Sequence, residues 1–390
     1  MALPALARLN NTLRIAAVGA PGYGYTRGVL SGIMRASLSR QDVEFLHFEQ
    51  LEGLLTALPF CHLDGLILCQ TAPELDNLGI PIVFATTDGA ADKPCVGVDD
   101  HAVGALAAEH FRQRGFRHLA FISMPEMIFP KRRWQGFSQA AKSFGASCAI
   151  TRLGGFWPRF RRLSWSAMDD EVIPWLASLP RPLGLLASND GIAVQVLRIC
   201  QQLNIRVPEE IAVLGVDNDE LACLMARPPL STIQLPTPQI GAEALAMICD
   251  RVANPHLPAK RLLLPPVQVI VRQSSESTAV VDPDVVAAIR YMRAHVGEPI
   301  GVEDLLSQVA LSRRELERRF MRLLGRTPLQ EILRLRLELA QHYLRTTTMK
   351  VPDVARRCGF VDISNFSRAF RSHTGHAPAA YRHAFGYRES

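Results

Sequence analysis

The chain has 390 residues, of which 48% are hydrophobic and 21% charged, and this length suits two or three domains rather than one. No run approaches the ~20 apolar residues of a membrane span, and the N-terminus lacks the layout of a secretion signal. Eight scattered cysteines without a C-x-x-C pair predict reduced thiols, so we expect a cytoplasmic protein with no membrane partner.

The first 283 residues predict an α/β fold of two lobes. Short apolar runs bounded by turns alternate with amphipathic stretches, which is typical of parallel sheets covered on both faces by helices. The predicted strands are Arg14–Ala20, Gly65–Cys69, Ile80–Phe84, His118–Ser123, Gly184–Ala187 and Ile211–Val216, and the predicted helices are Val103–Gln113, Arg132–Phe144 and Gly191–Leu203.

A glycine-rich loop follows the first predicted strand, "GAPGYGYTRG". Its spacing does not match G-x-G-x-x-G, and no placed acidic partner follows, so a nicotinamide site is rejected. Tyr25 and Arg27 on this loop are candidates to face the cleft between the lobes, where the Tyr25 ring would stack on a sugar ring; packing of the loop is the equal alternative. Asp88, after the strand Ile80–Phe84, is a weaker candidate of the same kind.

Other candidate ligand residues stand at strand ends and helix starts, where an α/β sheet presents its ligands. They are Arg133 in "RRWQGF", Asn189 and Asp190 in "SND", and Asp217 in "GVDND". Simpler alternatives remain for three of them: a surface charge for Arg133, a helix cap for Asp190 and a turn residue for Asp217. The acids in "DDH" at 99–101 are interpreted as helix caps, because consecutive residues do not easily converge on one metal ion.

Residues 273–283 predict a linker, because the Ser, Thr and Pro content of "RQSSESTAVVDP" interrupts both helix and strand periodicity. Beyond it the positive charge accumulates, with 18 Lys or Arg against 11 Asp or Glu from residue 284 onward. Such an excess predicts a polyanionic partner for the C-terminal part.

The C-terminal part repeats itself at an offset of fifty residues, and each copy predicts a helix, a turn and a second helix. Leu316 and Phe320 recur as Phe366 and Phe370, and Arg318 recurs as Arg368. At about 100° per residue the hydrophobic pair lies on one face of each second helix, with polar residues opposite. Helix starts are predicted by Ser312 followed by Glu315, a capping-box pattern, and by Asp362.

Between the copies, Leu329–Leu344 contains no Gly or Pro and predicts one continuous helix. Sixteen residues span roughly 24 Å at 1.5 Å per residue. Such a strut can hold two second helices near the ~34 Å repeat of successive major grooves. We therefore expect double-stranded DNA as the partner, contacted in two adjacent major grooves per protomer.

The segments "LSRRELERRFMRLLGRTP" and "CGFVDISNFSRAFRSHTGHAPAAYR" resemble the AraC/XylS family of transcription regulators over residues 284–385. The resemblance implies an all-α DNA-binding domain with two helix-turn-helix motifs. The alternative for individual arginines is a phosphate contact or a solvated helix face. The base contacts that it implies are Arg314, Glu317 and Arg318 in the first copy and Ile363, Ser364, Ser367 and Arg368 in the second.

The segments "CVGVDDHAVGALAAEHFRQRGFRHLAFIS" and "LLASNDGIAVQVLRICQQLNIRVPEEIAVLGVDNDE" resemble the sugar-binding core of LacI-type regulators, itself similar to periplasmic binding proteins. The resemblance covers residues 12–272 and implies inducer contacts at Arg133, Asn189 and Asp217. It also implies a homodimer formed through this domain. LacI-type proteins carry their DNA-binding module at the N-terminus, whereas this chain has only about a dozen residues there.

The order of the two modules is similar to that of the xylose-responsive type of operon regulator. This similarity implies a sugar effector, with D-xylose as the first candidate, and no cofactor or metal. It also implies activation of pentose catabolic genes, with RNA polymerase as a further candidate partner. Another sugar and repression remain alternatives. An enzyme with a DNA-binding tail is disfavoured because no nucleophile elbow or evident base stands out, and a purely structural DNA-binding protein is the other competing class.

Overall fold

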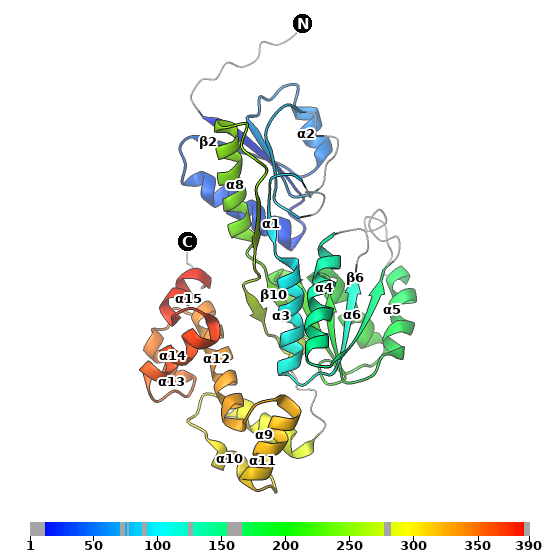
Figure 1. The fold of residues 1–390 in the computed structure, drawn as a ribbon, viewed down its shortest axis with the longest axis vertical. Coiled ribbons are helices and arrows are strands. Elements are labelled where there is room, and N and C mark those ends of the chain that lie inside the picture. The colour runs from blue at the N-terminus through cyan, green and yellow to red at the C-terminus, as the bar shows by residue number, and fades with distance from the viewer. Residues whose placement is uncertain are drawn as a thin grey trace. The chain divides into compact units, whose positions relative to one another are not determined.

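The computed structural model describes residues 12–70, 75, 78–87, 92–123, 128–153, 166–276 and 282–385. Contacts divide the chain into two compact units, an α/β unit that takes most residues up to 279 and a helical unit that takes the residues from 280 onward. The ribbon in Figure 1 shows the sheets of the first unit and the short helices of the second. None of the helices in the described ranges is long and apolar enough to cross a lipid bilayer.

The first sheet of the α/β unit has six strands in the order β11-β5-β4-β3-β1-β2, all paired parallel with their neighbours. The strands β3 and β5 are buried along their whole length, as expected when helices cover both faces of a parallel sheet. The bounds are β1 (Leu13–Val18), β2 (Val43–Phe48), β3 (Gly65–Leu68), β4 (Ile82–Phe84), β5 (Cys95–Val98) and β11 (Arg261–Leu264).

The second sheet also has six strands, in the order β12-β10-β9-β8-β6-β7. Only β12 runs antiparallel to its neighbour, β10, and the other pairs are parallel. The bounds are β6 (His118–Ser123), β7 (Ser147–Arg152), β8 (Leu183–Ala187), β9 (Ile211–Asp217), β10 (Ser231–Gln234) and β12 (Gln268–Ile270).

Each sheet forms a lobe with its own helices, and the chain passes from one lobe to the other after β5, after β10 and after β11. The first lobe carries α1 (Gly24–Leu38), α2 (Leu51–Ala57) and α8 (Thr237–Ala253). Close helix packing requires glycine there, because a Cβ on Gly32 would lie 2.0 Å from the Pro238 carbonyl oxygen. The second lobe carries α3 (Asp100–Gln113), α4 (Ile128–Ser143), α5 (Ser166–Ser178), α6 (Asp190–Gln202) and α7 (Glu220–Met225).

Aromatic rings fill the core beneath α3 and α4. Phe111 and Phe121 each lie close to Phe137, with centroid separations of 6.3 Å and 6.2 Å, and all three side chains are fully buried. Rings at this spacing pack edge-on or tilted rather than stacked face to face. This core fixes α4 against β6, and α4 carries one of the site residues described below.

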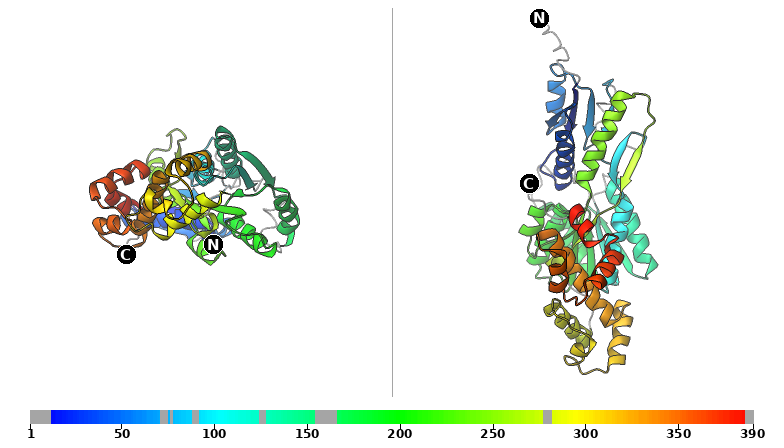
Figure 2. Two further views of the ribbon diagram at one scale, coloured as in Figure 1. Left: turned by 90° about the horizontal axis from the view of Figure 1, so that it is seen from below. Right: turned by 90° about the vertical axis from the view of Figure 1, so that its left-hand side faces the viewer.

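The helical unit consists of two similar halves joined by one long helix (Figure 2). The long helix α12 contributes Ile332 to the first hydrophobic core and Leu337 and Leu344 to the second. Its length therefore holds the two halves together. The bounds are α9 (Pro283–Ala294), α10 (Val302–Leu306), α11 (Arg313–Leu324), α12 (Pro328–Thr346), α13 (Val351–Arg357), α14 (Ile363–Thr374) and α15 (Pro378–Phe385).

The predicted fold class is confirmed: two parallel-sheet lobes precede a helical unit with two helix-turn-helix motifs. All six predicted strands and all three predicted helices of the first unit are present, with ends that differ by a few residues. The predicted helix Leu329–Leu344 is α12, extended at both ends. Of the predicted linker, residues 273–275 form a 3-10 turn (η2, Gln273–Ser275) whose two serines are fully buried against the second lobe.

Candidate functional site

Arg133 on α4 is the centre of a buried polar cluster in the α/β unit. Its side chain is 4% exposed, and its Nε donates to Oδ1 of Asp100 at 2.8 Å. Its Nη1 donates to the carbonyl oxygen of Ser188, and the guanidinium lies over the ring of Phe129, 4.5 Å from the centroid. The alternative of a surface helix charge is wrong, because a guanidinium this deep needs paired anions to offset its desolvation.

Asp217, at the carboxyl end of β9, supplies a second carboxylate to this cluster. Burial raises the pKa of Asp217 well above its ordinary value, the charge of Arg133 opposes that shift, and Asp190 and Asp100 add to it. No hydrogen bond within the described ranges involves the Asp217 carboxylate. Its backbone has φ +120°, in the region that non-glycine residues rarely adopt, and such strain concentrates at ligand sites.

Asn189 and Asp190 have different roles at the start of α6. The Asn189 side chain caps the helix by accepting from the amide of Ile192 at 2.9 Å, so the cap considered for Asp190 is made by Asn189 instead. Asp190 is 2% exposed and accepts from the hydroxyl of Thr232 at 2.5 Å and the amide of Asp219 at 2.8 Å. Burial, the dominant cause, raises the pKa of Asp190 to about 7 although these donors oppose the shift.

Two hydroxyl groups complete the surroundings of Arg133. The Tyr25 hydroxyl donates to the Ala85 carbonyl at 3.0 Å, which ties the ring to the first lobe, and burial raises the pKa of Tyr25 well above its ordinary value. The fully buried Ser188 hydroxyl has no hydrogen-bond partner among the described residues. An orphan hydroxyl beside buried charges is a position that a polar ligand can satisfy. Asp88 lies outside the described residues.

Sequence reasoning did not assign Asp100 to the site, and it placed Arg27 toward the cleft between the lobes without naming a partner. The "DDH" acids do include a cap, since Asp99 accepts from the amide of Ala102 at 3.0 Å. A helix start needs one cap, and the spare acid, Asp100, turns inward to Arg133. The second acidic residue at this helix start was therefore the sequence signal that could have assigned Asp100 to the site. Between the lobes, Arg27 of α1 pairs with Asp219 at 2.8 Å, a contact that no local pattern indicates.

The helical unit presents two second helices with matching inner faces, α11 and α14. Leu316 and Phe320 of α11 and Phe366 and Phe370 of α14 are fully buried, as predicted. Both helices end at a glycine with positive φ, Gly325 at +69° and Gly375 at +76°. Both inner faces are thus fixed by the same interactions, so the opposite face of each helix is free for a partner.

Helix capping also matches the prediction. Ser312 accepts from the amide of Glu315 at 3.3 Å, and Asp362 accepts from the amides of Ser364 and Asn365. The Glu315 carboxylate does not return to the Ser312 amide as a full capping box would require, because it pairs with arginines further along α11. That pairing distinguishes α11 from α14, where no carboxylate occupies the corresponding position.

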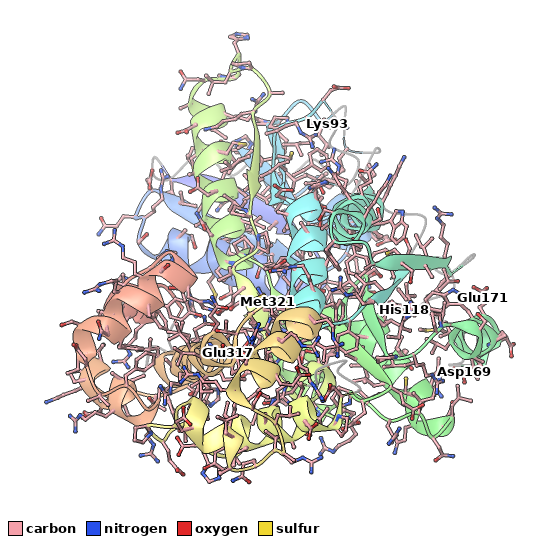
Figure 3. The ribbon with its side chains drawn as sticks, turned by 60° about the horizontal axis from the view of Figure 1, so that its bottom comes forward. Lys93, His118, Asp169, Glu171, Glu317 and Met321 are labelled. Carbon is pink, nitrogen blue, oxygen red and sulfur yellow. The ribbon has the colours of Figure 1, made fainter. Side chains whose placement is uncertain are left out.

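The predicted base-contacting residues lie on the outer faces of these helices. In α11, Arg314 and Arg318 are exposed and Glu317 is half-buried, and Figure 3 marks Glu317 one turn before the exposed Met321. In α14, Ile363, Ser364 and Arg368 are exposed and Ser367 is half-buried. Exposed guanidinium and hydroxyl groups can donate hydrogen bonds to the acceptor atoms of base edges in the major groove.

Comparison with known proteins matches the α/β unit and the helical unit to two different domain families. Residues 108–275 match a periplasmic binding protein-like domain, and residues 305–384 match a helix-turn-helix domain. The xylose operon regulatory protein of Escherichia coli K12 is 28% identical over 92% of this chain and 94% of its own length. That of Haemophilus influenzae is 26% identical over 92% and 95%. A structure titled as the xylose-binding transcription activator XylR matches 96% of this chain and 98% of its own, with 26% identity and a TM-score of 0.60.

The fold and the helix pairs define a DNA-binding transcription regulator whose effector domain is of the periplasmic-binding-protein type, and not an enzyme. Within that class the chain is similar in sequence and in domain order to the XylR type of regulator, in which the effector domain precedes the helix-turn-helix domain.

Proposed function

We propose that the chain is an activator of pentose catabolic genes that binds D-xylose at the Arg133 cluster and DNA through α11 and α14. The observation that carries the effector assignment is the buried guanidinium of Arg133, which pairs with the Asp100 carboxylate and acts electrostatically on that of Asp217. Sugar hydroxyls both donate and accept, so fixed carboxylates together with a fixed guanidinium can orient them. The names of the relatives support xylose as the sugar.

The charge of the cluster favours a neutral ligand. Asp100 is neutralised by Arg133, Asp190 has its pKa raised to about 7, and Asp217 adds a further acid. With one guanidinium among three carboxyl groups, a phosphorylated or acidic sugar would bring like charges together in a desolvated site. A free pentose avoids that cost. The effector residues of this proposal are Arg133, Asn189, Asp190, Asp217 and Tyr25, with Asp88 retained from the sequence.

On DNA, we assign one major groove to each of the two second helices, so that a protomer covers two adjacent grooves. The residues assigned to base edges are Arg314, Glu317 and Arg318 of α11 and Ile363, Ser364, Ser367 and Arg368 of α14. Arginine suits this role because its two parallel donors match the O6 and N7 acceptors of guanine. Residues 12–272, 273–283 and 284–385 are assigned as effector domain, linker and DNA-binding domain.

We further assign a homodimer through the α/β unit, placed in the cytoplasm, with RNA polymerase as the partner of activation. Exposed apolar side chains support the dimer: Leu221, 70% exposed, and Met225, 70%, on α7, and Leu38, 80%, on α1. Apolar groups gathered on an exposed helix mark interaction sites more often than they remain in water. All eight cysteines are free, which suits a reducing compartment.

Repression is the second candidate function. The ribose operon repressor of Escherichia coli K12 is 28% identical over 58% of this chain and 66% of its own length. The effector domain alone is therefore compatible with either direction of control. Transcription in vitro from a promoter carrying the selected duplex, with and without D-xylose, separates the two: activation requires more transcript when both protein and sugar are present.

The first test is isothermal titration of the full chain with a panel of pentoses and hexoses, followed by selection of bound duplexes from a random-sequence library. We expect D-xylose to bind and to raise the melting temperature by mass action. Arg133→Lys, which loses the two-point contact with Asp100 and the Ser188 carbonyl, should weaken binding at least tenfold. Arg132→Lys on the same helix is the matched control. If no sugar binds, the effector assignment fails; if no duplex is enriched, the DNA assignment fails.

A further inference from the structure

Three consecutive residues at the end of β9 have partners in three different parts of the chain. Asp217, at the carboxyl end of β9, is electrostatically coupled to Arg133 of the proposed effector site. Asn218 accepts through Oδ1 from Nη2 of Arg272 at 3.1 Å. Asp219 pairs with Arg27 of the other lobe at 2.8 Å. This tripeptide therefore connects the site, the second lobe's last segment and the opposite lobe.

The backbone of the tripeptide is held in an unfavourable conformation. Asp217 has φ +120° and Asn218 has φ +55°, both in the region that favours glycine. The conformation persists because the Asn218 amide donates to Thr232 Oγ1 at 3.2 Å and the Asp219 amide donates to Asp190 at 2.8 Å. A strained segment fixed by a few bonds can change conformation when one residue, here Asp217, gains a new partner.

Arg272 connects the tripeptide to the segment where the chain leaves the α/β unit. Its Nη1 donates to the Leu230 carbonyl at 2.9 Å, and its amide donates to Ser231 Oγ at 2.8 Å. Two residues later, the fully buried Ser274 accepts from the Ser231 amide and donates to the Val213 carbonyl. The segment from Arg272 to Ser274 is thereby attached both to the tripeptide and to the strands β9 and β10.

The helical unit holds the other end of the connection in a similar way. Asp282 caps α9 by accepting from the amides of Asp284 and Val285. The same carboxylate accepts from Nη1 of Arg319 at 3.1 Å, and Arg319 lies on α11, the first DNA-reading helix. The first described residue after the connection is thus bonded directly to a helix that we assign to DNA.

We propose that the tripeptide Asp217–Asp219 transmits effector binding to α11, with Arg272 and Arg319 as the positioning residues that anchor the two ends of the connecting chain. Six residues separate Ser275 from Asp282, and a connection of that length reaches at most about 25 Å when extended. A displacement of the first anchor that would exceed this reach must also displace the second anchor. This inference rests on the proposed sugar and DNA functions.

The test measures coupling, defined as the Kd of D-xylose for the free protein divided by its Kd for the protein bound to the selected duplex. By linkage the same ratio describes the effect of sugar on DNA affinity, and coupling ratios of 5 to 150 are typical. For the wild type we expect a ratio of about 10. Because the quotient cancels any change in sugar affinity common to both states, it isolates transmission from binding.

Three variants address the anchors. Arg272→Lys keeps the charge but loses the two-point contact with Asn218 and Leu230, Asn218→Gly tolerates the positive φ but removes the acceptor, and Arg319→Gln removes the ion pair with Asp282. Each should reduce the coupling ratio to about 1. Arg251→Gln is the control, because Arg251 also donates to loop carbonyls, those of Leu257 and Pro258, but in the other lobe.

The outcomes separate this inference from the proposed function. If the wild type binds sugar and DNA with a ratio near 10 and folded variants keep that ratio, the anchors do not transmit and the inference is wrong. A folded wild type that binds no sugar contradicts the proposed function instead, whereas a wild type that binds both ligands with a ratio of 1 contradicts the inference, because there is then no coupling to transmit. Should Arg272→Lys fail to fold, as judged by circular dichroism, Asn218→Gly and Arg319→Gln still decide.

Discussion

The two helix-turn-helix copies share a backbone arrangement but differ in how their outer charges are paired. In α11, Glu315 accepts from Nε and Nη2 of Arg318, both at 2.8 Å, and also from Arg319. At the corresponding offset in α14 the carboxylate is replaced by Asn365, and Arg368 has no ion pair within the described ranges. A duplicated fold can therefore carry one pre-oriented reading arginine and one that is free to adjust.

The pairing geometry bears on what each arginine can do. A carboxylate on the Nε and Nη2 edge of a guanidinium leaves its other edge available for the two acceptors of guanine. It also cancels a positive charge that would otherwise attract phosphates. We expect Arg318 to contribute specificity with little salt-dependent affinity, and Arg368 to contribute more of the salt-dependent affinity.

The largest expected effect tests whether the copies are packed alike. Phe320→Ala and Phe370→Ala each remove a fully buried ring from the corresponding position of the repeat. Each should lower the free energy of unfolding by about 3 to 5 kcal/mol, the usual cost of truncating a buried phenylalanine. Chemical denaturation followed by circular dichroism measures this, with the exposed Met321→Ala as control. Losses that differ by more than about 2 kcal/mol would show that the cores are not equivalent.

The next effect concerns the reading arginines. Arg318→Ala and Arg368→Ala should each cost about 1 to 3 kcal/mol on the selected duplex if the side chain reads a base. For a base reader the loss should fall on one base-pair step, so fluorescence anisotropy with single base-pair substitutions is the measurement. We expect a localised loss for Arg318. Uniform weakening across all sequences would show that Arg318 does not read a base, and an equal loss of salt-dependent affinity in both variants would remove the distinction between the copies.

A third comparison sets the carboxylates of the two units against each other. The hydrogen bonds of Arg318 and Arg319 lower the pKa of Glu315 to about 2, whereas burial raises that of Asp190 to about 7. Because the unfolded value for Asp is about 4, the folded protein holds the Asp190 proton more tightly between pH 4 and pH 7. The contribution of protonated Asp190 to the free energy of unfolding is therefore fully present below pH 4 and is lost as the pH rises to 7.

We expect the loss attributable to Asp190 between pH 5 and pH 7 to be about 1 to 3 kcal/mol, because each pKa unit of the shift corresponds to about 1.4 kcal/mol. Differential scanning calorimetry at pH 5 and pH 7.5 measures it, and Asp190→Asn should reduce the difference between the two conditions. Asp99→Asn, at a half-buried helix cap outside the cluster, is the control. A pH dependence identical in wild type and Asp190→Asn would contradict an ionisation of Asp190 in this window.

The smallest effect exchanges the pairing between the copies. Glu315→Gln should release Arg318, raise affinity for non-specific DNA two- to fivefold and steepen the salt slope by about one counterion. Asn365→Glu should do the reverse in α14 by placing a carboxylate three residues before Arg368, at the spacing seen in α11. Titrations at 50 and 200 mM salt test both. Equal salt slopes for wild type and both variants would show that the pairing does not persist on DNA.

Much of the fold was predictable because its signals are local. The six strands identified from the sequence are apolar runs bounded by turns, and the helix-turn-helix copies repeat with the same caps and inward faces. The strands that were not predicted are short or lie toward sheet edges, such as β2 and β7, whose residues are mostly half-buried. Half-buried strands mix polar and apolar residues, so their sequences are harder to distinguish from those of loops.

The site was only partly predictable. Arg133 and Asp217 could be proposed from their places beside helix starts and strand ends, but Asp100 was interpreted as a cap because its partner is 33 residues away. Nothing near Arg27 in the sequence indicates Asp219, since the two belong to different lobes. Pairs of this kind depend on how the sheets are packed.

The sequence by itself determined the two units, the tandem second helices and the class of regulator, because hydrophobic period, caps and repeat spacing are properties of short segments. Only the tertiary structure decided that Arg133 is buried against Asp100, that Asn189 rather than Asp190 caps α6, and that Arg272 is bonded to the tripeptide carrying Asp217. These contacts join residues distant in the chain. Their geometry and desolvation, and hence the pKa of each carboxyl group, exist only once the lobes have folded.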